Sequence, residues 1–327
     1  MTTRVAINGF GRIGRAFYKL AKKNSDLEIV AVNDLSDKDN LEYLLRHDSV
    51  YGLWEGSLDA KFIQEKDPAK LPWKDLNIDI VVESSGAYES YEKARAHIAA
   101  GAKRVVITAP AKDEETLETK TVLMGVNEKD LKHCIITSNG SCTTNSASPV
   151  MEVLNEKLGI KKAFLNTAHG YTATQSIVDS VVKGSDYRRG RAAAINIVPS
   201  TTGAAIAVGR AVHELLGKFD GVAMRVPVST GSLSAIVFLS ARETTIEEIN
   251  SILEEASRDP RWYGILTTTK DQLVSTDIIG NSHAAIADLT LTHVTDGDLC
   301  AVYSWYDNEM GYTHTLLQHV TKLGLTI

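Results

Sequence analysis

Short β-branched apolar runs alternate with segments of helical apolar spacing over the first 141 residues. Helical spacing follows the first run at Ile13, Ala16, Phe17 and Leu20, and it recurs around Leu41 and over 91–100. This alternation predicts a parallel sheet with crossover helices. The strands expected from the apolar runs are 5–7, 27–32, 78–82, 104–107, 122–124 and 134–136.

The pattern changes after residue 142. Apolar residues at Val150, Met151 and Leu154 predict a helix that starts near Cys142 and ends before Gly159. Longer alternating runs at 223–228, 234–239 and 299–305 then predict an antiparallel or mixed sheet with one covered face. Helices are expected over 244–256 and 315–323.

Composition limits the classes of function. The length of 327 residues predicts two domains, and no apolar run approaches the ~18 residues of a membrane span. The chain runs straight into its first strand, which leaves no room for a signal peptide. With a net charge of -6 and no dense basic block, nucleic acid is not expected as the main partner.

Cysteine and histidine usage points away from disulfides and metals. Cys134, Cys142 and Cys300 form neither an even disulfide set nor a close-spaced metal pattern. There is no His-x-x-x-His or Cys-x-x-Cys pair, so no metal site is expected. These features favour a reducing cytoplasmic location.

A Gly-x-Gly-x-x-Gly sequence joins the first strand to the first helix. Gly9 permits a tight turn, Gly11 lets a pyrophosphate approach the backbone, and Gly14 allows close helix packing. Asp34 ends the second strand, where a carboxylate can accept hydrogen bonds from a ribose diol. Strand, glycines, helix, strand and acid in this order predict a dinucleotide site. Asp34 would repel a 2′-phosphate, which favours NAD over NADP.

Cys142 is the candidate nucleophile. It lies where a strand turns into a helix, and both unpaired N–H groups and the helix dipole at such a position favour thiolate. A cysteine nucleophile needs a base, and His169, which ends a strand before a cluster of hydroxyls, is the best candidate. Spacing alone leaves their adjacency open.

Three further runs combine arginines, hydroxyls and glycines: 188–191, 200–203 and 224–227. They are typical either of solvated faces and subunit contacts or of phosphate sites, which use guanidinium, O–H and N–H donors.

The chain resembles phosphorylating glyceraldehyde-3-phosphate dehydrogenases from Asn8 to its C-terminus. The motifs follow the family's order: NGFGRIGR, VND, DSVYG, PWKDL, AGAKRVVITAP, SCTTN, YTATQ, STTGAA, RVP and WYDNE. The resemblance implies a Rossmann-type dinucleotide-binding domain, 1–141 plus 307–327, and an α+β catalytic domain with a large mixed or antiparallel sheet, 142–306. It also implies a homotetramer, through a loop at 180–191 that crosses a subunit interface.

The resemblance also implies the reaction and its residues. D-glyceraldehyde 3-phosphate would be oxidised to 1,3-bisphosphoglycerate in glycolysis or gluconeogenesis, with Cys142 attacking the aldehyde, His169 as base and inorganic phosphate taking the acyl group. The substrate and phosphate ligands implied are Thr172, Thr174 and Arg225 for the substrate's phosphate, with Ser141, Thr143, Arg189, Thr202 and Gly203 around the attacking one. The cofactor ligands implied are Gly9, Phe10, Gly11, Arg12, Ile13, Gly14, Asp34, Thr108 and Asn308.

Several positions depart from the family pattern. Gly140, Ser146, Gly170 and Met310 differ without removing a catalytic group, and Ser146 stands in place of a second cysteine. The segments 180–187 and 228–234 also differ. The first keeps NADP open as the cofactor, and the second keeps erythrose 4-phosphate open as the substrate. A cofactor-binding regulator without catalysis is the alternative of another class.

Overall fold

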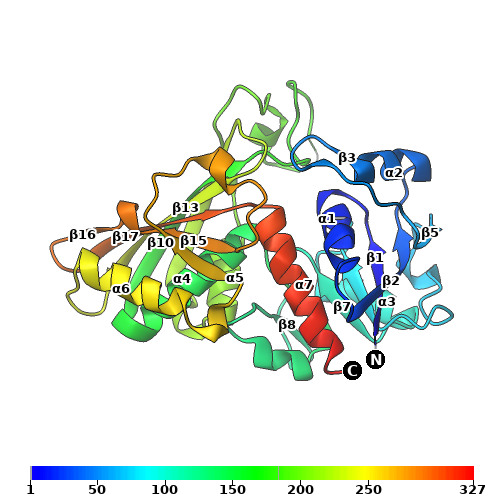
Figure 1. Ribbon diagram of the computed structural model, residues 1–327, viewed down its shortest axis with the longest axis horizontal. Coiled ribbons are helices and arrows are strands. Elements are labelled where there is room, and N and C mark those ends of the chain that lie inside the picture. Colours follow the sequence, from blue (N-terminus) through cyan, green and yellow to red (C-terminus); the bar gives the residue numbers. More distant parts are fainter. Residues whose placement is uncertain (1, 183) are drawn as a thin grey trace. The chain divides into compact units, whose positions relative to one another are not determined.

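The computed structural model describes residues 2–182 and 184–327 and divides into two compact units (Figure 1). The first unit comprises the chain up to Ser141 together with Thr313–Ile327, and the second comprises Cys142–Tyr312. Each unit is built around its own sheet.

The first unit is built on a seven-stranded sheet in which every neighbouring pair is parallel. The order is β5-β2-β1-β6-β7-β9-β8, so the chain reverses its direction of winding at β1. In parallel sheets, ligands bind at the carboxyl ends of the strands beside such a reversal. The strands are β1 (Thr3–Asn8), β2 (Leu27–Asn33), β5 (Lys61–Ile63), β6 (Ile80–Glu83), β7 (Arg104–Ile107), β8 (Thr119–Thr121) and β9 (Ile136–Ser138), with a separate hairpin of β3 (His47–Asp48) and β4 (Gly52–Leu53).

Three helices cross between these strands: α1 (Arg12–Ala21), α2 (Lys38–Arg46) and α3 (Tyr91–Ala99). The side chain of Asp37 accepts the N–H of Asn40, and that of Ser90 accepts the N–H of Lys93, so α2 and α3 begin on capping residues. The central strands are buried on both faces, as the successive residues Ala6 and Ile7 of β1 show, which explains their continuous apolar sequence.

One expected strand is wrong. Residues 122–124 are buried but lie in a turn, and the strand precedes them as β8. Asn127 causes the turn, because its Oδ1 accepts the N–H of Leu123 while its Nδ2 donates to the carbonyl of Thr121. The apolar run therefore marked the buried end of the strand rather than the strand itself.

The second unit holds an eight-stranded mixed sheet of order β11-β12-β10-β13-β17-β15-β14, with β16 also paired to β17. The pairs β10–β12 and β14–β15 are parallel and the others antiparallel, so the expected mixed sheet is confirmed. The strands are β10 (Ile160–Gly170), β11 (Val198–Thr201), β12 (Phe219–Val226), β13 (Ser232–Ser240), β14 (Leu266–Thr269), β15 (Ala285–Asp288), β16 (His293–Thr295) and β17 (Leu299–Tyr306).

Helix α4 (Cys142–Leu158) packs against the strands β10, β13, β15 and β17, and it contacts α5 (Ala204–Ala211) and α6 (Ile246–Ser257) (Figure 1). The final helix is α7 (Met310–Gly324). Alternate residues of β10 are buried, such as Leu165, Thr167 and His169, while Phe164 on the opposite face is 48% exposed. No helix among the described residues is long and apolar enough to cross a membrane.

Candidate active site and dinucleotide cradle

The glycine turn lies between β1 and α1, at the reversal point of the first sheet. Gly9 has a φ of +95°, and a Cβ there would come within 2.4 Å of the backbone of Ser85. A Cβ on Gly14 would come within 2.2 Å of the carbonyl oxygen of Gly9. At Gly11 a Cβ would meet no atom within 4 Å. Two glycines are therefore required by packing, and the third leaves open space at the start of α1.

A cavity of about 380 Å³ opens beside this turn. The backbone N–H groups at the start of α1 suit the pyrophosphate of a dinucleotide, and the carboxylate of Asp34 suits a ribose diol. The residues present thus fit the cofactor expected from the glycine sequence. The cavity is lined by the end of β1 and the turn after it (Asn8, Gly9, Gly11), the end of β2 and the residues after it (Asn33, Asp34, Leu35), the segment after β5 (Glu65, Lys66) and the segment after β6 (Ser84, Ser85, Ala87, Tyr88).

Asp34 is held in place by the backbone. Its Oδ2 accepts the N–H of Phe10 at 2.7 Å, and its Oδ1 accepts the N–H of Ser36 at 2.8 Å. The ring of Phe10 is buried edge-on against Tyr18, so Phe10 contributes to the turn through its N–H. The acid expected from the sequence is therefore bonded directly to the glycine turn.

Other expected cofactor residues lie around this turn. Arg12 begins α1, where it bonds Asp48 at 2.8 Å and its guanidinium lies 5.6 Å from the ring centre of Tyr51. Ile13 follows it and is half-buried. Thr108 follows β7, and its hydroxyl donates to the carbonyl of Glu83 at 3.0 Å.

Asn308 lies in the second unit, directly after β17. Its Oδ1 accepts hydroxyl hydrogen bonds from Ser232 at 2.8 Å and Thr230 at 3.1 Å. With Oδ1 engaged by these hydroxyls, the NH₂ group is the end of the amide that can donate to a ligand.

Cys142 and His169 meet in the second unit. Cys142 is the first residue of α4, and His169 is the last residue but one of β10. The Sγ of Cys142 lies 3.3 Å from Nε2 of His169. The structure thus brings together the candidate nucleophile and the candidate base, which the sequence alone could not place side by side.

Arg225 completes this group through strand register. β10 and β12 are parallel, and His169 and Arg225 are paired in register. Nη1 of Arg225 lies 2.6 Å from Nδ1 of His169, and the same Nδ1 lies 2.6 Å from the carbonyl oxygen of Gly170. Nδ1 can donate its proton to Gly170 or accept from Arg225, so the imidazole has a partner in either tautomer.

Burial sets the protonation of the pair. It raises the pKa of the Cys142 thiol, and the Arg225 guanidinium and the Thr143 N–H lower that pKa only in part. Burial and the charge of Arg225 together lower the pKa of His169 to about 3. The net direction for Cys142 is opposite to the one expected from the helix start alone, because desolvation of a thiolate outweighs the donors around it.

Tyr306 joins the two elements that carry the pair. Its hydroxyl lies 2.9 Å from the hydroxyl of Thr143 on α4 and 2.8 Å from that of Thr167 on β10. Its ring packs edge-on against His169. The hydroxyl of Thr143 is therefore engaged with Tyr306, while its N–H faces the sulfur of Cys142.

The expected phosphate ligands gather at two places. Beyond β10, the hydroxyls of Thr172 and Thr174 lie 3.0 Å apart, and Arg189 donates to Thr174 at 3.2 Å. At the start of α5, the Thr202 hydroxyl accepts the N–H of Ala204, and Gly203 is the N-cap. Ser141, just before α4, is partly exposed.

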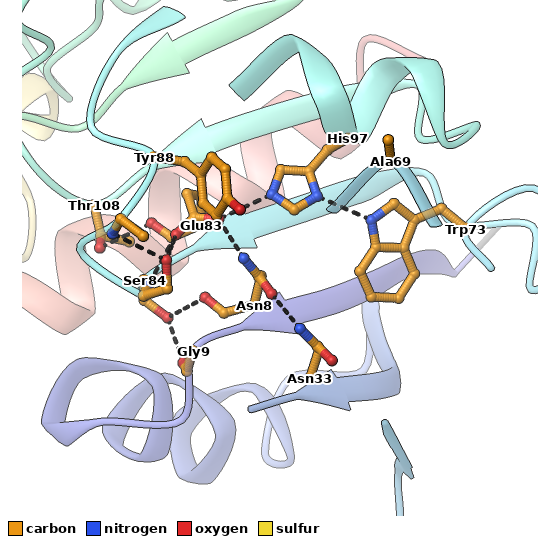
Figure 2. A network of polar contacts seen from close by, with 12 residues as sticks. Asn8, Gly9, Asn33, Ala69, Trp73, Glu83, Ser84, Tyr88, His97 and Thr108 are labelled. Carbon is orange, nitrogen blue, oxygen red and sulfur yellow. Dashed lines mark hydrogen bonds and ion pairs between the residues drawn. The ribbon is translucent and has the colours of Figure 1, made fainter. Parts of the chain in front are cut away.

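Sequence reasoning missed several of these residues. His97, which was not singled out from the sequence, is fully buried and bonds Trp73 and Glu83 (Figure 2). Thr230, Ser232 and Tyr306 were not singled out either. The only available signal was the placement of polar residues, such as Asn8 and Glu83, at the ends of apolar strands.

Comparison with known proteins agrees with this geometry. The family described as "Glyceraldehyde 3-phosphate dehydrogenase, NAD binding domain" matches residues 3–91, and "Glyceraldehyde 3-phosphate dehydrogenase, C-terminal domain" matches residues 141–308. A glyceraldehyde-3-phosphate dehydrogenase of Thermotoga maritima is 48% identical over 98% of each chain. Those of Borreliella burgdorferi and Clostridium pasteurianum are 44% and 43% identical, over at least 97% of each chain.

Proposed function

Because the chain belongs to the glyceraldehyde 3-phosphate dehydrogenase family, we propose that it oxidises D-glyceraldehyde 3-phosphate to 1,3-bisphosphoglycerate, with uptake of inorganic phosphate and reduction of NAD. The observation that carries this proposal is the 3.3 Å contact of Cys142 with His169, with Arg225 on the far side of the imidazole.

The first step forms a covalent bond to the substrate. His169 Nε2 takes the thiol proton of Cys142, the sulfur adds to the aldehyde carbon, and the proton passes to the carbonyl oxygen to give a hemithioacetal. The backbone N–H groups at the start of α4 are placed to stabilise the oxyanion that forms on the way. Because burial raises the pKa of the thiol and lowers that of His169, the imidazole relays this proton to the carbonyl oxygen and does not retain it.

The second step makes and uses a thioester. NAD, when bound, supplies the hydride acceptor. His169 removes the hydroxyl proton as the hemithioacetal becomes a thioester. A phosphate oxygen then attacks the thioester carbon, the carbon–sulfur bond breaks, and His169 returns the proton to the departing Cys142 sulfur.

The anion sites divide between two phosphates. Thr172, Thr174 and Arg225 would hold the substrate's phosphate, and Ser141, Thr202 and Gly203 the attacking one. Arg189 bonds Thr174, which supports a role for this guanidinium at the boundary of the two groups. The glycine turn, Asp34 and Thr108 would hold the dinucleotide, and Asn308, from its match to the family pattern, would orient the carboxamide.

The chain is proposed to act as a homotetramer in the cytoplasm. The segment 177–197 carries five aliphatic side chains that are each at least 68% exposed: Ile177, Val178, Val181, Ile195 and Ile197. Apolar surface of this kind favours contact with another protein, here a second copy. The three free cysteines are consistent with a reducing compartment. Sedimentation equilibrium of the purified chain tests the tetramer, and a monomer would contradict it.

The reaction is tested by following NADH absorbance with the aldehyde and NAD, with and without inorganic phosphate. NADH formation should require both the aldehyde and phosphate, with arsenate able to replace phosphate. Equal rates without either anion would overturn the phosphorylating assignment. Erythrose 4-phosphate is the control substrate, and its kcat/KM should be lower. The geometry gives no support to a silent regulator, because the nucleophile and the base are in contact.

A further inference from the structure

A chain of buried polar side chains runs behind the glycine turn of the first unit (Figure 2). It contains Trp73, His97, Glu83, Asn8 and Asn33, each at most 4% exposed. The residues come from five separate stretches of the chain: β1, β2, the turn at 73, the end of β6, and α3. None of them is needed by the chemistry at Cys142, so the network calls for a separate explanation.

The direction of the hydrogen bonds is fixed at the Trp73 end. An indole nitrogen can only donate, so Nε1 of Trp73 donates to Nδ1 of His97 at 3.0 Å. Nδ1 of His97 is therefore the unprotonated nitrogen, and Nε2 carries the proton. That proton is donated to Oε2 of Glu83 at 2.9 Å.

The direction is also fixed at the Asn33 end. Oδ1 of Asn33 accepts the N–H of Glu65 at 2.9 Å, and Nδ2 donates to the carbonyl of Glu65 at the same distance. Nδ2 of Asn33 also donates to Oδ1 of Asn8 at 2.7 Å. The amide of Asn8 must therefore present its NH₂ group to Glu83, where it donates to Oε2 at 2.5 Å.

Two chains of donors with fixed direction thus converge on one carboxylate. The other oxygen, Oε1, accepts the N–H of Ser85 at 2.8 Å and the hydroxyl of Ser85. A carboxylate is the one side chain that can accept from all four donors at once, because it has no donor of its own when ionised. Glu83 therefore accepts hydrogen bonds from four donors, which no neutral side chain at this position could do.

The groups that Glu83 holds are those that shape the dinucleotide cavity. Asn8 and Ser85 both line it. The backbone of Ser85 is the surface against which Gly9 packs, so closely that a Cβ on Gly9 would come within 2.4 Å of it. Ser84 adds a hydrogen bond to the carbonyl of Gly9 at 2.6 Å. A displacement of Ser85 would therefore move the glycine turn.

We propose that Glu83 is a positioning residue for the dinucleotide, which holds Asn8 and Ser85 so that the glycine turn and the cavity keep their binding geometry. His97, held in one tautomer by Trp73, is the donor that keeps the Glu83 carboxylate in place from the side of α3. The inference rests on the proposed dinucleotide site. It assigns no contact between Glu83 and the reacting atoms.

Glu83→Gln is the sharpest test, because it preserves size and removes only acceptor capacity. If the amide oxygen faces Asn8 and His97, the amide nitrogen meets the N–H of Ser85. If the amide is turned round, its nitrogen meets both Asn8 and His97. Each placement sets N–H against N–H, so the Ser85 turn or Asn8 must move.

The experiment measures NAD affinity directly, by calorimetry or by quenching of protein fluorescence, alongside kinetics. Glu83→Gln is expected to raise the Kd for NAD at least tenfold. The KM for the aldehyde, and kcat at saturating NAD, should change less than twofold. Val105→Ala, in the same apolar core but outside the network, controls for lost stability and should leave the Kd within twofold of wild type.

The outcomes separate the inference from the function on which it rests. Failure of the wild-type chain to bind NAD would overturn both. Wild-type binding with an unchanged Kd in Glu83→Gln, or an equal rise in Val105→Ala, would overturn the positioning role alone.

A second pair of variants covers the case in which Glu83→Gln fails to fold. His97→Gln keeps an N–H donor for Glu83 and an oxygen acceptor for Trp73, and it should bind NAD within threefold of wild type. His97→Leu removes both and should raise the Kd at least fivefold. Equal affinity of these two variants for NAD would contradict the proposal.

Discussion

Arg225 and His169 face each other across two parallel strands, with Nη1 of the arginine 2.6 Å from Nδ1 of the imidazole. The positive charge therefore acts on both members of the reacting pair. It lowers the pKa of Cys142 and also that of His169. Arg225 thus favours the thiolate while opposing an imidazolium beside it, which makes it a tuning group as well as a candidate phosphate ligand.

Replacing Arg225 by methionine should make Cys142 less reactive at neutral pH. Loss of the guanidinium raises the thiol pKa further, so the rate of alkylation by iodoacetamide should reach its maximum roughly one pH unit higher. Inactivation rates measured from pH 6 to 10 test this. Arg189→Met is the matched control, since Arg189 bonds Thr174 rather than His169. A profile that shifts equally in both variants would refute the specific role.

Cys142→Ser should remove turnover and retain the cofactor. A hydroxyl beside His169 is a far weaker nucleophile than a thiol, so kcat should fall by several orders of magnitude. The Kd for NAD should stay within about twofold, because the glycine turn is untouched. Stopped-flow NADH formation and calorimetry measure the two quantities. Substantial residual turnover would mean that another group attacks the aldehyde.

Ser232→Ala should weaken the hold on Asn308. The Ser232 hydroxyl accepts the N–H of Gly170 and donates to Asn308, so its loss leaves the amide with Thr230 alone. One hydrogen bond is worth about 1 kcal/mol, so kcat/KM for NAD should drop several-fold. Ser234→Ala, two residues along β13, removes a buried hydroxyl that has no hydrogen-bond partner. That control should behave like wild type, and similar losses in both would contradict the role of Ser232.

Asp34→Ser should relax the choice between NAD and NADP. The carboxylate is fixed beside the cavity by Phe10 and Ser36, where it would repel a 2′-phosphate. Its removal should raise kcat/KM for NADP relative to NAD by about tenfold or more, equivalent to roughly 1.4 kcal/mol. Steady-state kinetics with both cofactors test this. An unchanged ratio would place the discrimination elsewhere, with the segment 180–187 as the next candidate.

His319 should make the fold sensitive to mild acid. It is fully buried between Thr137 and Asn139, and burial lowers its pKa to about 3. Between pH ~6.5 and ~3 the unfolded chain binds a proton there that the folded chain does not. Stability therefore falls with falling pH, by up to ~1.4 kcal/mol per pH unit for this group.

His319→Gln should reduce that acid slope, even though it lowers stability at pH 7.5. Urea midpoints between pH 7.5 and 5.5 give the slope, and the range stays above the titration of most carboxyl groups. His169 should contribute in the same direction, because its pKa is also about 3. An identical slope in wild type and His319→Gln would mean that His319 titrates alike in both states.

The sequence allowed both sheets and the position of Cys142 at a helix start to be predicted, because each depends on local pattern. A few residues are enough to predict these structures. The glycines at 9, 11 and 14 predict a tight turn, and the alternation in β13 and β17 predicts strands with one buried face. The start of α4 at Cys142 is equally local. The contact of Cys142 with His169 is not, since it depends on how α4 packs on β10, and no spacing encodes that.

The Glu83 network shows a different limit. His97 lies in a helix with a weak apolar pattern, and its neighbours Trp73 and Glu83 come from distant parts of the chain. The thiol pKa was misjudged for a related reason. The helix start acts over one turn and can be read from the sequence, whereas desolvation depends on everything packed around the sulfur.

The pairing of β10 with β12 has a consequence for how this protein can change. The chain between them, residues 171–218, carries the exposed segment, the hydroxyl groups and α5. Insertions there can alter oligomer contacts or cofactor choice and still leave the imidazole opposite the guanidinium. A single residue added inside either strand would turn the side chain of His169 or of Arg225 to the other side of the sheet. Catalytic activity would then be lost. Residues 171–218 can therefore vary in length, whereas the paired residues of β10 and β12 cannot.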